Sequence, residues 1–382
     1  MQYLERISTS ETAAWYRLGG DYDERGIKRW VVSTPTTREI CNRPEVFGVE
    51  FSRGLQAGVR AALETAPFRE DLETVSQSRL CVMNFLRGSL SFGIREAMYD
   101  ALGTNRHVTC FMSSQRYRKD GRWHVKEDMY RKMDIPAGAV LLVGDVVATG
   151  VTMSNGLDVI SEHLEKNDIG PTGIVFFTIG CHKAEKALQA FHERFADVRP
   201  DYVGTHVVYL EGKFSLVDSR TPLHIALPGT DLIKLDALLA PEFELSLYDA
   251  LPYVLERCVI YDAGSRAFDL PEYLEDVLHY WEQMRRLSKR GFTLREAMRE
   301  RWPEVDQVDM RTLRQARTVQ WRGVPEETMD LLHERYRKRW TDVFDEGARD
   351  PEALGRVAEE RIETLAGAMG PVEAEPGNGG SA

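Results

Sequence analysis

The feature that most constrains this chain is a repeated alternation of short apolar runs with amphipathic stretches, which extends from about residue 79 to residue 216. Short apolar runs bounded by polar residues are typical of buried parallel strands, and the stretches between them have the spacing of crossover helices. A chain with this rhythm buries its strands in one sheet and covers both faces of that sheet with helices. We therefore expect an α/β core in which a parallel sheet is flanked by helices.

The expected strands and helices alternate along the whole of this segment. The strands are expected at residues 80–85, 108–112, 139–143, 173–179 and 202–209. The helices are expected at residues 90–102, 152–165 and 184–195. Apolar residues recur on one face of each expected helix, as they do in helices that pack on a sheet. Because the same unit repeats, the fold class depends on more than any single boundary.

The segments on either side of this core differ from it in pattern. Residues 1–75 are mixed, contain an expected helix at residues 51–65, and could cap the core as a hood. Residues 221–369 include long charged segments with helical periodicity, and residues 370–382 are rich in Pro, Gly and Glu, a composition typical of disorder. We therefore expect an N-terminal flank, a core at residues 76–220, an extra, mostly helical C-terminal region and a disordered tail.

The composition excludes several classes of function. Lys and Arg total 49 against 60 Asp and Glu, so the formal net charge is −11. A chain with this balance is a poor candidate for a general binder of nucleic acid or of acidic membranes. No apolar run approaches the roughly 20 residues of a membrane span, and no leader is evident. The five cysteines are scattered without a C-x-x-C pair, which argues against a disulfide framework and a zinc site and favours a cytoplasmic protein.

The sequence VLLVGDVVATGVT, from Val140 to Thr152, has the features of a phosphate-binding loop. An apolar strand is expected to end at Gly144 and Asp145, and small residues then lead directly into a helix. Backbone amides in such a turn and a helix N-terminus form a concave anion site, to which Thr149 and Thr152 can add hydroxyl donors. Asp145 would lie at the carboxyl end of its strand, where it could accept hydrogen bonds from sugar hydroxyls.

At these residues the chain resembles the type I phosphoribosyltransferase family. The family signature is four apolar residues, two acids, a few variable positions and Thr-Gly-x-Thr or a close relative. The resemblance implies that Asp145 holds the ribose hydroxyls of 5-phosphoribosyl pyrophosphate, whereas Gly144 replaces the first acid and marks a divergent member. It also implies that the 5-phosphate is held by Ala148, Thr149, Gly150, Val151 and Thr152.

Two further segments agree with the resemblance in their order along the chain. The family has a pyrophosphate-binding loop after its first core strand, and here the corresponding residues are Arg87, Gly88 and Ser89. It also has a loop between the second and third core strands that closes over the reaction centre. That interval contains basic residues that would approach the pyrophosphate, with the first three preferred: Arg116, Arg118, Lys119, Arg122 and Lys126.

Plainer interpretations exist for each of these segments. A strand followed by Gly-Asp and a Thr-Gly turn occurs in many α/β proteins, and an Arg-Gly pair is commonly an ordinary turn. The basic interval also contains acids, so an exposed hairpin is an alternative. For residues 255–268 we expect a buried strand followed by a turn, with a loop that returns to the active site as the alternative. Structural roles are expected for His107, His182 and His206, which lie near predicted strand ends.

The resemblance implies a transferase that moves the phosphoribosyl group to a nitrogenous acceptor and releases pyrophosphate, with Mg²⁺ as cofactor. Ala148 stands where the 6-oxopurine branch has Asp, so hypoxanthine, guanine and xanthine are disfavoured, and a biosynthetic acceptor is expected. The alternatives are a sensor or regulatory protein that binds the ligand without turnover, favoured by Gly144, and an assembly module built on the C-terminal helices. A homodimer is compatible with the sequence. If Gly144 only weakens the ribose contact, Gly144→Asp should raise donor affinity.

Overall fold

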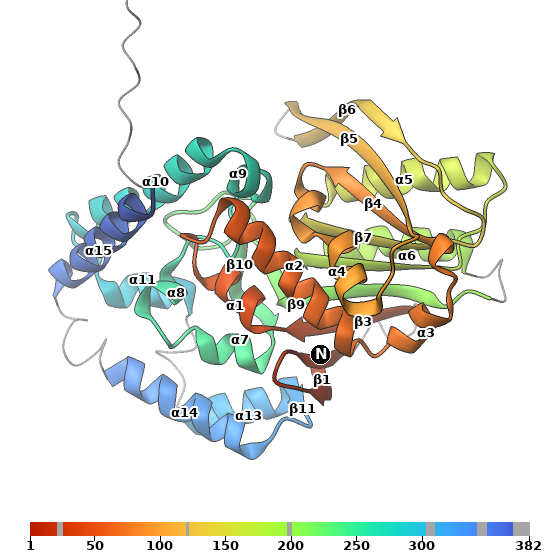
Figure 1. The fold of residues 1–382 in the computed structure, drawn as a ribbon. Helices are drawn as coiled ribbons and strands as arrows, with labels where there is room; N and C mark the ends of the chain where they lie inside the picture. Colours follow the sequence, from red (N-terminus) through yellow and green to blue (C-terminus); the bar gives the residue numbers. More distant parts are fainter. Residues whose placement is uncertain (21–25, 120–121, 197–200, 303–309, 342–349, 370–382) are drawn as a thin grey trace, which may run out of the picture.

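The computed structural model describes residues 1–20, 26–119, 122–196, 201–302, 310–341 and 350–369. Its centre is one 11-stranded sheet in the order β11-β1-β2-β3-β9-β8-β7-β4-β5-β6, with β10 beside β9 (Figure 1). No helix in these ranges combines the length and the apolar character needed to cross a membrane.

The strands are β1 (Tyr3–Thr9), β2 (Ala14–Gly19), β3 (Ile27–Ser33), β4 (Leu80–Leu86), β5 (Val108–Lys119), β6 (Arg122–Lys132), β7 (Val140–Val147), β8 (Gly173–Gly180), β9 (Gly204–Leu216), β10 (Leu232–Leu239) and β11 (Trp321–Arg322). The helices are α1 (Pro35–Asn42), α2 (Gly48–Thr65), α3 (Arg69–Thr74), α4 (Ile94–Leu102), α5 (Val151–Lys166), α6 (Lys183–Phe195), α7 (Pro241–Ser246), α8 (Leu251–Leu255), α9 (Ala263–Phe268), α10 (Leu270–Ser288), α11 (Leu294–Arg301), α13 (Met310–Gln320), α14 (Glu326–Thr341) and α15 (Pro351–Met369). Two short 3₁₀ helices are η2 (Gln77–Arg79) and η3 (Gly88–Phe92).

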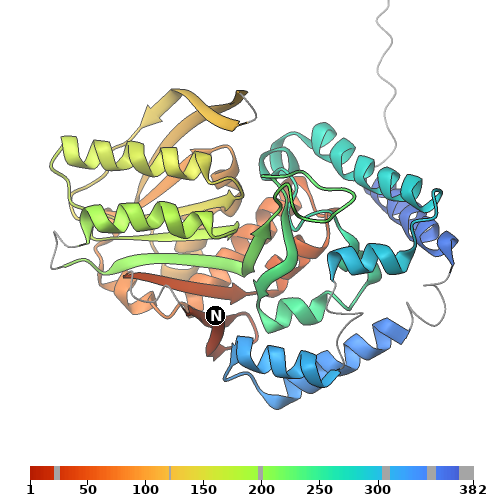
Figure 2. The same ribbon diagram turned by 180° about the vertical axis from the view of Figure 1, so that it is seen from behind.

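The predicted α/β core is confirmed. Strands β3, β9, β8, β7, β4 and β5 run parallel, and β6 is antiparallel to β5. Helices α5 and α6 cover one face of the sheet, and α1, α2 and α4 lie on the other (Figures 1 and 2). From β4 the chain proceeds outward to β5 and β6, and then returns to β7 on the other side of β4. The order therefore reverses between β4 and β7, and an open α/β sheet binds ligands at such a switch point.

Two boundaries differ from the expected ones for local reasons. The helix expected at residues 90–102 is divided into η3 and α4 by Gly93, whose φ is +53°. A Cβ atom at Gly93 would lie 2.9 Å from Cβ of Gln56 on α2, so the close approach of the two segments requires glycine there. Strand β7 does not end at Gly144 and Asp145 but continues to Val147, because residues 144–147 pair with residues 177–180 of β8.

Strand β5 is also longer than expected. It continues from Val108 to Lys119 and returns as β6. Asp120 and Gly121, which lie outside the described residues, form the dipeptide most typical of a two-residue hairpin connection. This dipeptide is a sequence signal for a hairpin. The basic interval does contain the antiparallel pair β5–β6, in agreement with the alternative interpretation of that interval.

The C-terminal helices pack on the N-terminal flank and do not form a detached appendage. Strand β11 pairs with β1, and α9 contacts α2 and η3. The guanidinium of Arg266 on α9 is buried and donates hydrogen bonds to the carbonyl oxygens of Ile40, Arg43 and Val46. These bonds hold α9 against the loop between α1 and α2, and they thereby fix one side of the cavity described below. The expected disordered tail, residues 370–382, lies outside the described residues.

Candidate functional site

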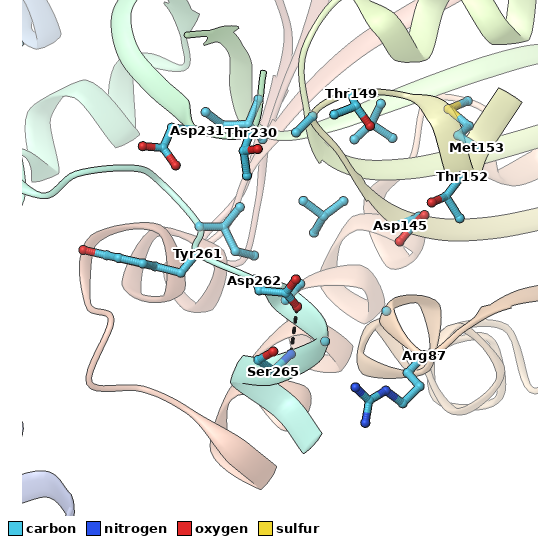
Figure 3. A pocket seen from close by; sticks show the side chains of 18 of the residues that line it. Arg87, Asp145, Thr149, Thr152, Met153, Thr230, Asp231, Tyr261, Asp262 and Ser265 are labelled. Carbon is cyan, nitrogen blue, oxygen red and sulfur yellow. Dashed lines mark hydrogen bonds between the residues drawn. The ribbon is translucent and has the colours of Figure 1, made fainter. Parts of the chain in front are cut away.

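A cavity of about 610 Å³ lies at the point where the strand order reverses. One wall consists of the carboxyl ends of β4 and β7 together with the start of α5. The opposite wall consists of residues between 227 and 276, with α9 at its centre (Figure 3). None of the described side chains that line the cavity comes from residues 1–75. The wall that faces the core therefore comes from the C-terminal region.

The predicted phosphate loop forms part of the first wall. Gly150 precedes the first residue of α5 with φ of +75° and turns the chain into the helix. The Thr149 hydroxyl accepts a hydrogen bond of 3.3 Å from the backbone N–H of Val151. The first backbone amides of a helix have no acceptor within the helix, so those after Val151 can bind an anion. Ala148, Thr149, Gly150 and Thr152 line the cavity, whereas the Val151 side chain does not.

The expected ribose and pyrophosphate residues meet beside this loop. Asp145 is 8% exposed and lines the cavity together with Arg87 and Gly88. A Cβ atom at Gly88 would lie 2.9 Å from Oδ1 of Asp145, so the glycine allows the turn after β4 to lie directly against the carboxylate. The peptide bond that precedes Arg87 is cis. Ser89 is buried, and its hydroxyl accepts a hydrogen bond from the backbone N–H of Phe85, so its side chain holds the turn instead of lining the cavity.

Packing against Phe92 explains why position 144, where the family signature has its first acid, is glycine. A Cβ atom at Gly144 would lie 2.6 Å from Cγ and 2.7 Å from Cβ of Phe92. Phe92 is fully buried and cannot move without disturbing η3. A carboxylate at position 144 therefore has no room, and the expectation that Gly144→Asp would raise donor affinity is replaced by an expectation of lost stability.

The basic residues of the hairpin lie on the same edge of the sheet as the cavity. Leu86, the last residue of β4, pairs with Ser113 of β5. Arg116, Arg118 and Lys119 follow on β5, so their backbone lies beyond the carboxyl end of β4. Their side chains lie outside the part of the structure that is described, so only their place along the strand is known.

Residues 255–268 form much of the opposite wall. The expected strand is wrong: α8 ends at Leu255, an irregular segment follows, and α9 begins at Ala263. A backbone hydrogen bond of 2.8 Å from Val259 to Leu232 attaches this segment to β10, so its apolar residues are buried by packing and not by a strand ladder. Residues 260–265 reach the cavity, as in the alternative interpretation. Arg257 of the same segment also lines the cavity. Sequence reasoning missed the remaining residues of this wall, which are Leu227, Thr230, Asp231, Leu232, Glu272 and Asp276.

The opposite wall is acidic. Its charged residues are the guanidinium of Arg257 and the carboxylates of Asp231, Asp262, Glu272 and Asp276. Arg257 donates two hydrogen bonds to Asp276, at 2.7 and 2.9 Å, and its Nε lies 3.2 Å from Oδ2 of Asp231. Burial raises the pKa of Asp231, although Arg257 opposes the shift. Asp262 caps α9 by accepting a hydrogen bond of 2.8 Å from the N–H of Ser265 (Figure 3).

The cavity thus has two chemically different sides. The side of β4, β7 and α5 offers backbone amides, hydroxyl groups and Arg87, which suit an anion. The side of α9 offers carboxylates, which suit a cation or a hydrogen-bond donor. In the part of the chain that the structure describes, no group of three or more His, Cys, Asp and Glu side chains is placed to hold a metal ion.

Comparisons with known proteins leave the chain without an assigned family. No family model matches it, and no curated protein matches it. Solved structures that resemble part of it include the AQ2163 protein of Aquifex aeolicus, with 13% identity over 48% of this chain and 89% of that one and a TM-score of 0.33. A hypothetical protein of Neisseria gonorrhoeae with bound ppGpp has 12% identity over 32% of this chain and 66% of that one, with a TM-score of 0.22.

A hypoxanthine-guanine phosphoribosyltransferase of Bacillus anthracis has 16% identity over 44% of this chain and 82% of that one, with a TM-score of 0.25. At these TM-scores the likenesses establish neither a family nor an activity for this chain.

Proposed function

We propose that this protein binds 5-phosphoribosyl pyrophosphate in the cavity at the β4–β7 switch point and transfers the phosphoribosyl group to a nitrogenous acceptor. The observation that supports this most is the meeting of Thr149–Thr152, Asp145 and Arg87–Gly88 around one cavity. Arg87 and Gly88 are far in the sequence from the segment that contains Asp145 and Thr149–Thr152, and each of the three groups suits a different part of the same donor.

The assignment of roles follows from the chemistry of each group. The amides and hydroxyls from Thr149 to Thr152 would hold the 5-phosphate at the start of α5. Asp145, which is largely buried, would accept hydrogen bonds from the ribose hydroxyls. Arg87 and the amide of Gly88 would face the pyrophosphate, and a guanidinium there would stabilise the negative charge that grows as the pyrophosphate leaves.

The basic hairpin would complete the pyrophosphate side. On β5, the residues Arg116, Arg118 and Lys119 come after the position that pairs with the last residue of β4, so their backbone lies beyond the carboxyl end of β4. Cations on that part of β5 would attract a highly charged donor to this edge of the sheet. This attraction is useful in a chain whose net charge is −11, because the overall charge repels anions.

Mg²⁺ is the implied cofactor. The residues present fit an ion that would be held mainly by oxygens of the donor, and Asp145 is the protein carboxylate that lines this side of the cavity. When bound, the ion would neutralise charge on the departing pyrophosphate. The protein would contribute position, through Asp145 and the loop at Thr149–Thr152, and exclusion of water by the α9 wall.

The acidic wall indicates the chemistry of the acceptor. An acceptor bound between α9 and the ribose would face Asp262 and Glu272. Carboxylates there favour amino or amidine-like nitrogen over an anionic group. Ala148 leaves no acid on the phosphate loop for an oxopurine ring, in keeping with a non-6-oxopurine acceptor.

Pyrophosphate release tests this proposal. The protein is incubated with Mg²⁺, phosphoribosyl pyrophosphate and a panel of nitrogenous bases and amines. We expect release that depends on one class of acceptor. Asp145→Asn should lower it by about 10- to 100-fold, since a charge-assisted hydrogen bond contributes roughly 1.5–3 kcal/mol. Lys166→Met, at the exposed end of α5, is the control that should leave the rate unchanged.

A ligand sensor without turnover is the second candidate, and Gly144 is the observation that favours it. Because Phe92 occupies the space that a side chain at position 144 would need, Asp145 is the single carboxylate where the family signature has two acids. Donor binding that depends on Asp145 and Thr152, together with no pyrophosphate release from any acceptor, would support the sensor. Absence of donor binding would rule out both candidates.

A further inference from the structure

A second cavity, of about 710 Å³, lies on the α6 side of the sheet and shares no lining residue with the first. It is bounded by α6, β3, the carboxyl half of β9 and β10. Figure 2 looks onto this face, where β3 and β9 run alongside α6. Register places Lys213 of β9 beside Gly180, the last residue of β8. The part of the second cavity at Lys213 therefore lies at the carboxyl end of β8, whereas Ile27 and Arg29 come from the amino half of β3.

The inner end of this cavity holds a buried charge cluster. Glu185 on α6 accepts hydrogen bonds of 3.1 Å from Nζ of Lys213 and of 3.0 Å from the hydroxyl of Tyr209. Its other carboxylate oxygen lies 3.8 Å from Nη1 of Arg29. The side chains of Arg29 and Lys213 are only 2% and 11% exposed. The cations of Arg29 and Lys213 thus lie on either side of the Glu185 carboxylate, in a site that is largely shielded from solvent.

Further positive charge lies at the rim. Lys186 adds a third cation to the lining, and the acids among the lining side chains are Glu185 and the exposed Asp236. His182 also lines the cavity, but burial and the cations around it lower the pKa of its imidazole and favour the neutral form. Burial of a cation is costly unless an anion compensates its charge, and Glu185 supplies only one negative charge for Arg29 and Lys213. The cavity therefore suits an anionic ligand.

The remaining lining side chains indicate the form of that ligand. Gln189 and Ser215 offer hydrogen bonds, and Ile27, Leu216 and Leu238 provide an apolar surface. A cavity of this size holds a small molecule. Lysine is a common partner of phosphate groups, to which it contributes a point charge.

We propose that this second cavity binds a small phosphate-bearing molecule, with its phosphate at Lys213 and Arg29. The site is separate from the one assigned to phosphoribosyl pyrophosphate. Binding there does not depend on the proposed function, whereas its effect on the first site does.

The turn before α6 connects the two sites. The backbone N–H of Cys181 donates a hydrogen bond of 3.1 Å to Val147, and its Sγ lies 3.3 Å from the carbonyl oxygen of Ala148. A Cβ atom at Gly150 would lie 3.0 Å from Cβ of Lys183. A ligand that contacts His182 and Lys186 would therefore act on the segment that holds the 5-phosphate loop. Occupancy of the second site should change donor affinity at the first.

Anomalous diffraction from crystals soaked in selenate, a tetrahedral dianion, locates both sites independently. We expect one peak at Thr149–Thr152 and another beside Lys213 and Arg29. The second peak should disappear in Lys213→Met and remain in Lys213→Arg and in the control Lys166→Met. A missing second peak in the unsubstituted protein, or one that persists in Lys213→Met, would overturn the proposal.

Equilibrium dialysis with inorganic phosphate provides the solution test. We expect two sites per chain, of which Lys213→Met weakens one by at least about tenfold, as expected for loss of a charge-assisted hydrogen bond. Thr152→Val should weaken the other. A single site that Lys213→Met leaves unchanged refutes the second site. A single site that Lys213→Met weakens instead refutes phosphate binding by the loop, so the two failures are distinguishable.

Discussion

Substitution of Gly144 by alanine tests whether packing against Phe92 is the reason for the missing acid. The added Cβ atom would lie 2.6 Å from Cγ of Phe92, about 1 Å closer than the ~3.5–4.0 Å optimum for two carbon atoms. Both residues are buried. The φ angle of Gly144 is not among the positive ones, so no backbone strain contributes and the effect is steric.

The expected cost of Gly144→Ala is about 1–3 kcal/mol, the usual range for an extra methyl group in a packed core. Gly144→Asp should cost more, because it also buries a carboxylate. Gly367→Ala is the matched control, since a Cβ atom at Gly367 in α15 meets nothing within 4 Å. Alanine in a helix should be neutral or stabilising there by up to about 1 kcal/mol.

Urea-induced unfolding followed by circular dichroism measures these changes, and an unchanged m-value would show that the unfolded states are comparable. Binding of phosphoribosyl pyrophosphate is measured on the same samples. A loss below about 0.5 kcal/mol for Gly144→Ala, within the range of ordinary surface substitutions, would refute the steric argument. Tighter donor binding by a fully stable Gly144→Asp variant would refute it as well.

Three further predictions concern other residues. Thr152→Val keeps the shape of the side chain, removes the hydroxyl, and should raise the KM for phosphoribosyl pyrophosphate about tenfold in the pyrophosphate assay; an unchanged KM would remove Thr152 from the phosphate site. Asp262→Asn keeps a residue that can cap α9, so the free energy of unfolding should not change. The KM for a cationic acceptor should rise, and the KM for the donor should not. An equal rise in both KM values would contradict binding of the acceptor at this wall. Burial lowers the pKa of His206 to about 3, so below pH 6.5 the unfolded chain binds a proton at this residue that the native chain does not, and the free energy of unfolding should fall by about 2 kcal/mol from pH 7 to pH 5. Urea titrations should show a smaller fall for His206→Gln. An equal fall in the variant would show that another group is responsible.

The sequence by itself determined the succession of strands and helices in the core and the place of the turn at Thr149–Thr152. Local patterns suffice there, because a buried strand needs a continuous apolar run and a helix needs one apolar face. The run Val140–Val143 and the turn Thr149–Thr152 lie where these patterns put them. Asp145 was expected at the carboxyl end of its strand and Arg87 was implied by the family resemblance, and both residues line the cavity.

Only the tertiary structure decided what faces that loop and why Gly144 is glycine. The wall at Asp231, Arg257 and Asp262 comes from segments far from the core in sequence, and its position depends on contacts such as those of Arg266 with the α1–α2 loop. No periodicity encodes such long-range packing. Likewise, the space around Gly144 is set by Phe92, a contact between elements that no local pattern reveals. The sequence specified the wall formed by β4, β7 and the start of α5, and long-range packing supplied the acidic wall opposite it.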